Sequence, residues 1–211
     1  TMSDTLDERV VIVDIDEKSL AELGRWPWPR DRVANLLDRL FDQHGVALVG
    51  FDTVFAEPDH STGLRQLEQL ANGAWGQRSG FAAELQRLRP ALDHDEHLAR
   101  AMRGRAVVLG YYFGNDASGQ SAGQLPAPAI LASDLDNRPV RSTSWDTYGA
   151  NLAVLTAAAS GAGFFNALPD EDGVIRALPL LAEHGGALYA SLALAMYQQW
   201  GKWSRIAPEF P

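Results

Sequence analysis

Apolar and polar residues follow one another along the chain in blocks that predict alternating strands and helices. Residues 10–15 form a short run of mostly β-branched apolar side chains, and residues 46–51 form a second one. Such runs are typical of parallel strands that are buried on both faces. Between them, apolar residues recur with helical spacing over residues 33–41, and Gly45 ends this helix. Residues 10–52 are therefore predicted to form a right-handed strand–helix–strand unit.

The alternation continues towards the C-terminus. Residues 60–90 contain two stretches with helical spacing that glycines interrupt, and a third helix containing Leu98 and Met102 ends at Gly104. Residues 106–113 are predicted to form the next strand. Residues 163–166 and 174–183 are predicted to pair as an antiparallel hairpin around the turn at 169–173, and a final helix covers residues 191–200.

These elements predict an α/β fold with a mixed, mostly parallel central sheet, flanking helices and a C-terminal antiparallel hairpin. The chain has 211 residues, of which 46% are hydrophobic, and this is enough for a sizeable core. We expect a single domain over residues 1–211. Within it, residues 60–92 are expected to be a helical insertion and residues 115–160 a variable loop region.

Composition narrows the classes of partner and chemistry. With 18 Lys and Arg against 27 Asp and Glu, the formal net charge of −9 repels phosphate backbones, so nucleic acid is not an expected partner. The absence of cysteine excludes disulfides and thiolate chemistry but leaves the compartment open. The first nine residues are polar and acidic rather than an export signal, and we expect the chain to be a fragment of a longer protein.

Acidic residues follow the carboxyl ends of the predicted strands at 10–15 and 46–51. Because the carboxyl ends of neighbouring parallel strands meet at the edge where open α/β sheets bind ligands, we expect these acids to line a shared pocket. They are Asp14, Asp16, Asp52, Glu57 and Asp59.

Clustered carboxylates repel one another unless a positive charge neutralises them. Arg30 and Arg176 would do so as internal partners. A hard cation such as Ca²⁺ or Mg²⁺ would also do so, with Asp14, Asp52 and Asp59 as its ligands, and so would a cationic ligand. The spacing of the residues does not separate these interpretations.

The aromatic segment before the first predicted helix also has two interpretations. Trp26-Pro27-Trp28-Pro29-Arg30 would form a rigid apolar entry to the helix, because proline is tolerated in a first helical turn. In the second interpretation, Trp28 and Arg30 form the wall of a site for an aromatic or anionic ligand.

Several ordered motifs carry a family resemblance. VVIVDIDEKSL at residues 10–20, GRWPWPR at 24–30 and GFDTVFAEPD at 50–59 resemble the CHASE2 family of extracytoplasmic sensor domains. The resemblance resumes at residues 95–102 and 163–181 and covers most of the chain. It implies an input domain, itself no enzyme, of a bacterial transmembrane receptor with a cyclase, diguanylate cyclase or sensor kinase as its output.

The resemblance also implies a place and partners. The domain would lie on the periplasmic side of the inner membrane, attached only through flanking helices that this chain lacks, and would bind an unknown small-molecule or ionic ligand. A homodimer is expected, since soluble assemblies prefer twofold symmetry.

Two other functions stay open. The first is a Mg²⁺-dependent phosphatase resembling the haloacid dehalogenase class, in which Asp14 and Asp16 would act as nucleophile and general acid, although Lys18 stands where that class has Thr or Val. The second is a protein-interaction module that presents the helical insertion to a partner.

Overall fold

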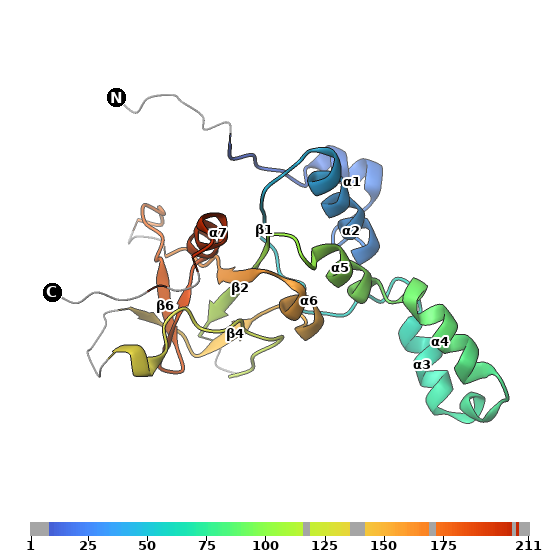
Figure 1. Cartoon of the computed structure of the whole chain (residues 1–211). Helices are drawn as coiled ribbons and strands as arrows, with labels where there is room; N and C mark the ends of the chain where they lie inside the picture. Colours follow the sequence, from blue (N-terminus) through green and yellow to red (C-terminus); the bar gives the residue numbers. More distant parts are fainter. Residues whose placement is uncertain (1–8, 116–118, 136–141, 169–171, 204–205, 207–211) are drawn as a thin grey trace.

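The computed structural model describes residues 9–115, 119–135, 142–168, 172–203 and 206, and Figure 1 shows the arrangement of its elements. In chain order they are α1 (Glu17–Leu23), α2 (Arg30–Asp38), the π-helix η1 (Arg39–Gln43), β1 (Val49–Phe51), α3 (Leu64–Asn72), the 3₁₀ helix η2 (Ala74–Gln77), α4 (Phe81–Leu92), α5 (His94–Met102), β2 (Val107–Gly114), the 3₁₀ helix η3 (Ala132–Leu135), β3 (Thr143–Ser144), β4 (Thr147–Gly149), α6 (Ala153–Ala158), β5 (Gly161–Phe164), β6 (Leu181–His184), β7 (Ala187–Ala190) and α7 (Leu192–Gly201).

The main sheet is built around β2. β1 pairs with it in parallel, placing Val49 opposite Val107, and β5 pairs in parallel along the other edge, placing Ala162 opposite Leu109. β4 runs antiparallel to the last residues of β2. Nearly all of β2 is buried, as its continuous apolar sequence predicts for a central parallel strand. The predicted mixed, mostly parallel sheet is confirmed.

Helices cover both faces of this sheet, as predicted (Figure 1). Val107 and Leu109 pack on one face against the apolar sides of α2, α5 and α6. Val108 points to the opposite face and packs against α7. There α7 comes so close to β1 that a Cβ on Gly50 would lie 2.3 Å from the sulfur of Met196, so a larger residue at this position would force the Met196 side chain to move.

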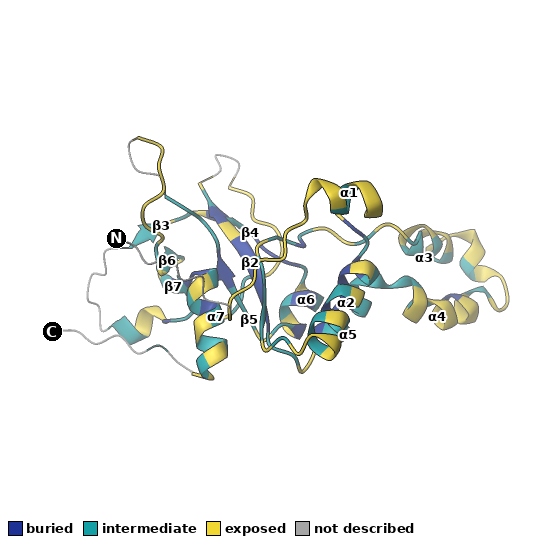
Figure 2. Ribbon diagram, turned by 90° about the horizontal axis from the view of Figure 1, so that it is seen from above, coloured by how far each residue is buried: buried dark blue, intermediate teal, exposed yellow. Residues whose placement is uncertain are grey.

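The two helices within residues 60–92 leave the body as an arm. α3 and α4 lie side by side and project away from the sheet, where most of their residues are exposed (Figure 2). The arm is closed at its base by Thr62, whose hydroxyl donates to the backbone oxygen of Leu92 at 2.7 Å. The prediction of two helices over residues 60–90, interrupted by glycines, is confirmed.

The predicted pairing of residues 163–166 with 174–183 is wrong. β5 joins the main sheet beside β2, whereas β6 belongs to a second sheet in which β3 and β7 flank it. The C-terminal hairpin is β6–β7, which turns at Gly185 and Gly186, both with positive φ. The predicted turn at 169–173 lies partly outside the described residues. Residues 174–180 contain no strand.

The predicted first strand is also wrong in this structure. Residues 10–15 pair with no described strand, and Val11 and Ile12 are 76% and 89% exposed. α1 follows without a buried residue, as its exposed surface in Figure 2 shows. An apolar β-branched run favours extended backbone, but its partner is chosen by tertiary contacts that local propensity does not encode. The strand–helix–strand unit over 10–52 is therefore incomplete.

Asn151 joins the main sheet to the loops around it. β1 and β4 leave a gap along β2 at Gly110, and the side-chain amide of Asn151 fills it. Its Nδ2 donates to the backbone oxygen of Gly110, and its Oδ1 accepts from the backbone N–H of Phe55, both at 2.8 Å. Asn151 is only 1% exposed, so water cannot replace these bonds.

We predict that Asn151→Leu lowers the free energy of unfolding by about 3 kcal/mol, because it leaves a buried N–H and a buried C=O without partners. Urea unfolding would measure the change. Asn72→Leu, at an exposed position at the end of α3, is the control and is expected to change stability by less than about 0.5 kcal/mol. Equal stability of the two variants would contradict the structural role of Asn151.

Candidate functional site

The structure brings together only some of the acids that the sequence assigns to a pocket. Asp14 and Asp52 are exposed, and Asp16 caps α1 by accepting from the N–H and hydroxyl of Ser19. Glu57 has an exposed side chain and contributes its backbone oxygen instead. Asp59 alone of the five has a buried carboxylate, 6% exposed.

The predicted metal ligands are not assembled. Among the described residues, no group of three or more His, Asp or Glu side chains is arranged to hold a metal ion. Asp14 does not reach Asp52 and Asp59, because the segment that carries it is not part of the sheet.

Arg30 is the centre of a buried polar network at the start of α2. Its backbone N–H donates to Asp59 Oδ2 at 2.7 Å, and its Nη2 donates to the backbone oxygen of Glu57 at 3.1 Å. Its Nε lies 3.6 Å from Asp95 Oδ1, and its guanidinium lies over the ring of Phe55 at 4.6 Å. Arg30 therefore connects α2 to α5 and to the loop after β1.

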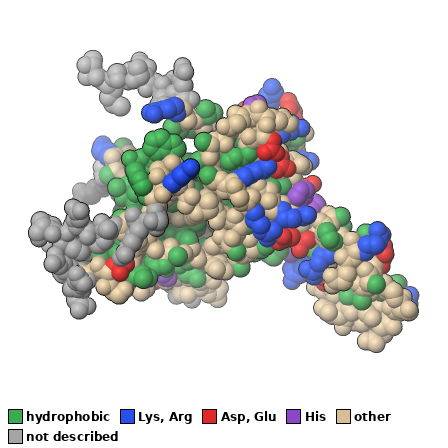
Figure 3. All heavy atoms as spheres, viewed as in Figure 1, with side chains coloured by type: hydrophobic (Ala, Val, Ile, Leu, Met, Phe, Trp, Pro, Cys, Tyr) green, Lys and Arg blue, Asp and Glu red, His purple; other side chains and the backbone are tan. Residues whose placement is uncertain are grey.

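The loop after β1 is held to α5 by further bonds. The N–H of Asp59 donates to Asp95 Oδ2 at 2.9 Å. His94 Nδ1 lies 3.4 Å from Asp59 Oδ2, 3.5 Å from Asp31 Oδ1 and 3.2 Å from the hydroxyl of Ser61. His94 and Asp95 enter the network because α5 begins beside Asp59. Acidic and basic side chains gather over this part of the surface, where the arm leaves the body (Figure 3).

The network shifts the two buried carboxylates in opposite directions. Burial raises the pKa of Asp59, but hydrogen bonds from Arg30 and Ser61, together with the charge of His94, outweigh it and lower the pKa below 3.8. Burial raises the pKa of Asp95 above 3.8, and the bond from Asp59 and the charge of Arg30 only partly offset it. Asp59 is therefore the firmly ionised partner of Arg30.

Arg176 and Trp28 take local roles. Arg176 pairs with Asp172, four residues earlier, and both side chains are more than half exposed. Trp28 is buried, and its indole N–H donates to the backbone oxygen of Gly24 at 2.8 Å. Its ring meets Trp26 edge-on, so the two indoles pack at the entry to α2.

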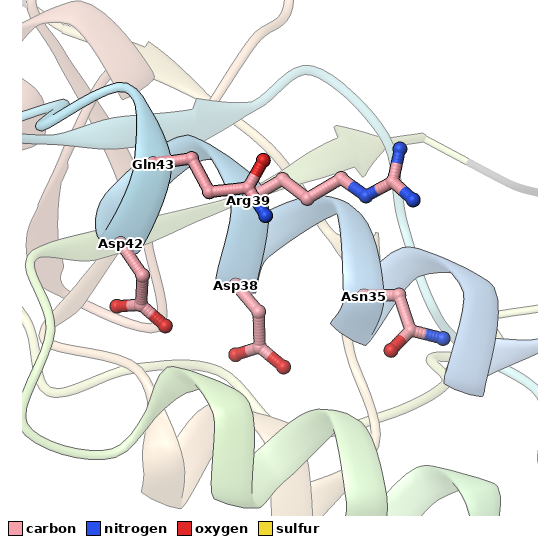
Figure 4. Close-up of a pocket in the computed structure, with 5 residues that line it drawn as sticks. All are labelled: Asn35, Asp38, Arg39, Asp42 and Gln43. Atoms are coloured by element: carbon pink, nitrogen blue, oxygen red, sulfur yellow. The ribbon is translucent and has the colours of Figure 1, made fainter.

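A hollow of about 420 Å³ on the outer side of α2 and η1 is also polar. Figure 4 shows Asp38 and Asp42 pointing the same way from successive turns, while Arg39 extends towards the other side. Arg105 lies within 2.6 Å of Asp38 and 3.0 Å of Asp42 and neutralises both. This arrangement ties η1 to the chain before β2, so neither acid of the hollow is free of a basic partner.

A larger cleft of about 790 Å³ lies between residues 124–131, the junction of α6 and β5, and α7. The loop is fixed at both ends, because Gln124 N–H donates to the oxygen of Asn151 and Ala129 N–H donates to that of Leu188, both at 2.9 Å. Pro126 and Pro128 stiffen the span between these bonds. The loop therefore forms a fixed wall.

The opposite walls of the cleft are built from small residues. The run Ala157-Ala-Ala-Ser-Gly161 connects α6 to β5 and leaves the space open because its side chains have little volume. Ala195 forms part of the floor on α7.

Hydrogen-bonding groups line this space, and among the described residues that border it Asp134 is the one that carries a charge. The Gln199 amide donates to the oxygen of Ser160 at 2.7 Å, and the Thr156 hydroxyl donates to that of Gln124 at 3.2 Å. Gln198 also lines the cleft. The volume of the cleft is that of an ordinary ligand pocket, and its lining offers amide and hydroxyl groups to a small polar molecule.

Comparison with known proteins places the chain in a family. A model of the CHASE2 domain matches residues 1–209. The chain belongs to the CHASE2 family. CHASE2 is an extracellular sensory domain of signalling receptors and is not catalytic. No curated protein and no solved structure matches this CHASE2 domain.

Two further observations bear on the alternatives. In the described ranges of this CHASE2 domain, no helix has the length and apolar character needed to span a membrane. The two acids of the phosphatase interpretation, Asp14 and Asp16, lie on an exposed segment outside the sheet, with Asp16 engaged as a helix cap. This arrangement provides no buried nucleophile and acid pair at a strand end.

We predict that Arg30→Met destabilises this CHASE2 domain by about 3 kcal/mol, because it leaves buried carboxylates without their cation. Adding Asp95→Asn is expected to recover part of the loss. Arg87→Met is the control, since Arg87 and its partner Glu84 are 70% and 55% exposed and such a pair contributes less than about 1 kcal/mol. Chemical denaturation would compare the variants, and equal effects of Arg30→Met and Arg87→Met would contradict the network.

The low pKa of Asp59 predicts a pH dependence. The ionised carboxylate of Asp59 adds to the free energy of unfolding at pH values above its unfolded-state pKa of about 3.8. This contribution is lost as the pH falls through the lower pKa of the folded state. Asp59→Asn is therefore expected to be less stable than wild type at pH 7, by about 1–2 kcal/mol, and to approach it below pH 4. Unfolding curves from pH 3 to 7 would test this, with Asp146→Asn, at an exposed position outside the network, as a control that changes little throughout. A constant difference for Asp59→Asn would refute the assignment.

Proposed function

We propose that this CHASE2 domain is the extracytoplasmic ligand-sensing input domain of a bacterial transmembrane receptor whose output is a cyclase, diguanylate cyclase or sensor kinase. Its ligand is a small, uncharged, polar molecule held between residues 124–131 and α7. Family membership supports the sensory role. The cleft of about 790 Å³, with its fixed proline wall and its amide and hydroxyl groups, is the observation that carries the ligand class.

The distribution of charge supports an uncharged ligand over an ionic one. The arginines nearest the predicted acidic edge are engaged within the domain. The guanidinium of Arg30 pairs with Asp95 and donates to the backbone oxygen of Glu57, and Arg105 pairs with Asp38 and Asp42. A ligand that used these groups would have to displace their partners. A ligand in the cleft would not have to displace the carboxylates that pair with Arg30 and Arg105.

Sensing requires that the ligand bind one conformation of the domain more tightly than another. The cleft is suited to this because its walls come from separate elements. The wall at 124–131 is tied to β7 through Leu188, whereas the floor belongs to α7. A ligand that contacts both walls favours the arrangement in which they are close.

The proposal is tested by filling the cleft from one side. Ala157 on α6 is exposed and lines the cleft, whereas Ala153, one turn earlier on the same helix, is exposed and does not line it. Ala157→Trp is therefore expected to block binding, and Ala153→Trp is its matched control. Both substitutions add the same ring to the same helix.

The probe is a panel of uncharged sugars, nucleosides and polyols, together with dicarboxylates and Ca²⁺. A true ligand at 100 times its Kd stabilises the folded state by about 2.7 kcal/mol, which corresponds to a Tm rise of about 5–10 °C for a domain of this size. We expect an uncharged compound to give this rise in wild type and Ala153→Trp and not in Ala157→Trp. A rise only with charged compounds, or one that Ala157→Trp retains, would contradict the proposal.

A further inference from the structure

Residues 10–15 have the sequence of a buried strand and the surroundings of a surface segment. Val10, Val11, Ile12 and Val13 are between 58% and 89% exposed. A continuous apolar run without alternation suits a strand covered on both faces, and an exposed run of this kind is an unfavourable arrangement in water. These residues lack the cover that their sequence requires.

β1 offers an unoccupied place for such a strand. It pairs with β2 and with no other described strand, so its second edge is open. Val49 N–H donates to the oxygen of Ala106 on the β2 side, and the backbone groups of Gly50, the next residue, therefore point to the open edge. Helices cover both faces of the sheet here, α2 on one and α7 on the other. A strand at this edge would lie between two helical layers.

The direction of α2 makes this place reachable for residues 10–15. The first N–H of α2, that of Arg30, donates to Asp59, which follows β1. The N-terminus of α2 therefore lies at the carboxyl end of β1. A strand that precedes α2 and runs parallel to β1 would end at this same side of the sheet. Residues 16–29 would then only have to connect its end to the start of α2 on that side. The result would be a strand–helix–strand connection between neighbouring parallel strands, for which parallel sheets prefer the right-handed form.

We propose that residues 10–15 dock as a parallel strand on the open edge of β1 in their own chain, and that the structure shows the undocked state. α1 moves with the strand, since it has no buried residue to hold it. Docking covers the apolar run on both faces and supplies hydrogen-bond partners to the outward backbone groups of β1. This inference is independent of the ligand proposed for the cleft.

Hydrogen exchange on the whole chain tests docking directly. Undocked, the amides of residues 10–15 have no strand partner and exchange at the rate of an unfolded peptide. With docking, we expect the amides of residues 10–15 and of Gly50 to exchange at least ten times more slowly than in an unfolded peptide.

A substitution gives a second readout. Ile12→Asp places a charge on the docked strand, and we expect it to abolish the protection and lower the Tm by about 5 °C. Val174→Asp, at another exposed β-branched residue, is the control and is expected to shift the Tm by less than about 1 °C. Unprotected amides in wild type, together with equal Tm values for the two variants, would overturn the proposal.

Introduced cysteines identify the chain that supplies the strand. Because the chain has no cysteine of its own, Val11→Cys with Val49→Cys gives a single pair of thiols, and docking with Asp14 level with Asp52 places the two side by side. Oxidation is expected to form a disulfide within one chain, seen on a non-reducing gel. Val11→Cys with Val174→Cys is the control pair and is expected to stay reduced. A disulfide-linked dimer as the only product would overturn docking within the chain and assign the strand to a second copy.

Discussion

The backbone of β2 must be hydrogen-bonded along both edges, because the strand is buried and an unpaired buried N–H or C=O is costly. Three strands and the residues that flank them supply most of the partners, and two asparagine side chains supply others. The Asn151 amide donates to the backbone oxygen of Gly110 between β1 and β4. Beyond the end of β5, Asn166 Oδ1 accepts from the N–H of Phe113 at 2.7 Å, and Asn166 Nδ2 donates to the oxygen of Phe113 at 2.8 Å. The strands can diverge at these points without leaving gaps.

This arrangement also positions the cleft. Asn151 fixes the start of the loop at residue 124 through its own backbone oxygen, while its side chain holds β2. The loop then crosses to Leu188 in the second sheet. The cleft wall is thus attached to both sheets through rigid contacts, so a ligand bound there touches elements that the sheet itself holds in register.

The charged network around Arg30 and the cleft proposed as the ligand site are built from different residues. The acids that follow two predicted strand ends suggested an acidic site, yet many of the acids near the sheet edge are partners of arginines or caps of helices. Arg30 illustrates the reason. A buried guanidinium needs nearby carboxylates to be stable, so ion-pair networks gather acids as effectively as a metal site does. The walls of the cleft, by contrast, consist largely of alanine, glycine and proline, and Asp134 is the one charged side chain among its described lining residues.

The sequence predicted what depends on local pattern. The amphipathic spacing of Val33 and Leu37 gave α2, the glycines at 73, 76 and 80 gave the broken helical arm, and the continuous apolar run gave β2. It did not predict what depends on partners. β5 and β6 are close in sequence but belong to different sheets, and Arg30 meets Asp95 across 65 positions. The cleft was missed because it results from small side chains, for which spacing rules give no signal.

The cleft and the open edge of β1 meet at α7. Ala195, Gln198 and Gln199 of α7 contribute to the cleft, while Met196 of the same helix packs directly against Gly50 of β1. A ligand that shifts α7 therefore alters the layer that would cover a strand docked on β1. Packed interfaces respond to such shifts by changing between discrete arrangements rather than by deforming continuously.

The coupling is reciprocal, since any difference in ligand affinity between the docked and undocked states is equally a difference in docking between the free and bound domain. A coupling of 1.4 kcal/mol would change the docked population about tenfold, and one helix that contacts both places is sufficient to carry it. Residues 10–15 would then report occupancy of the cleft through α7, and the acids Asp14 and Asp52 would come together only in the docked state.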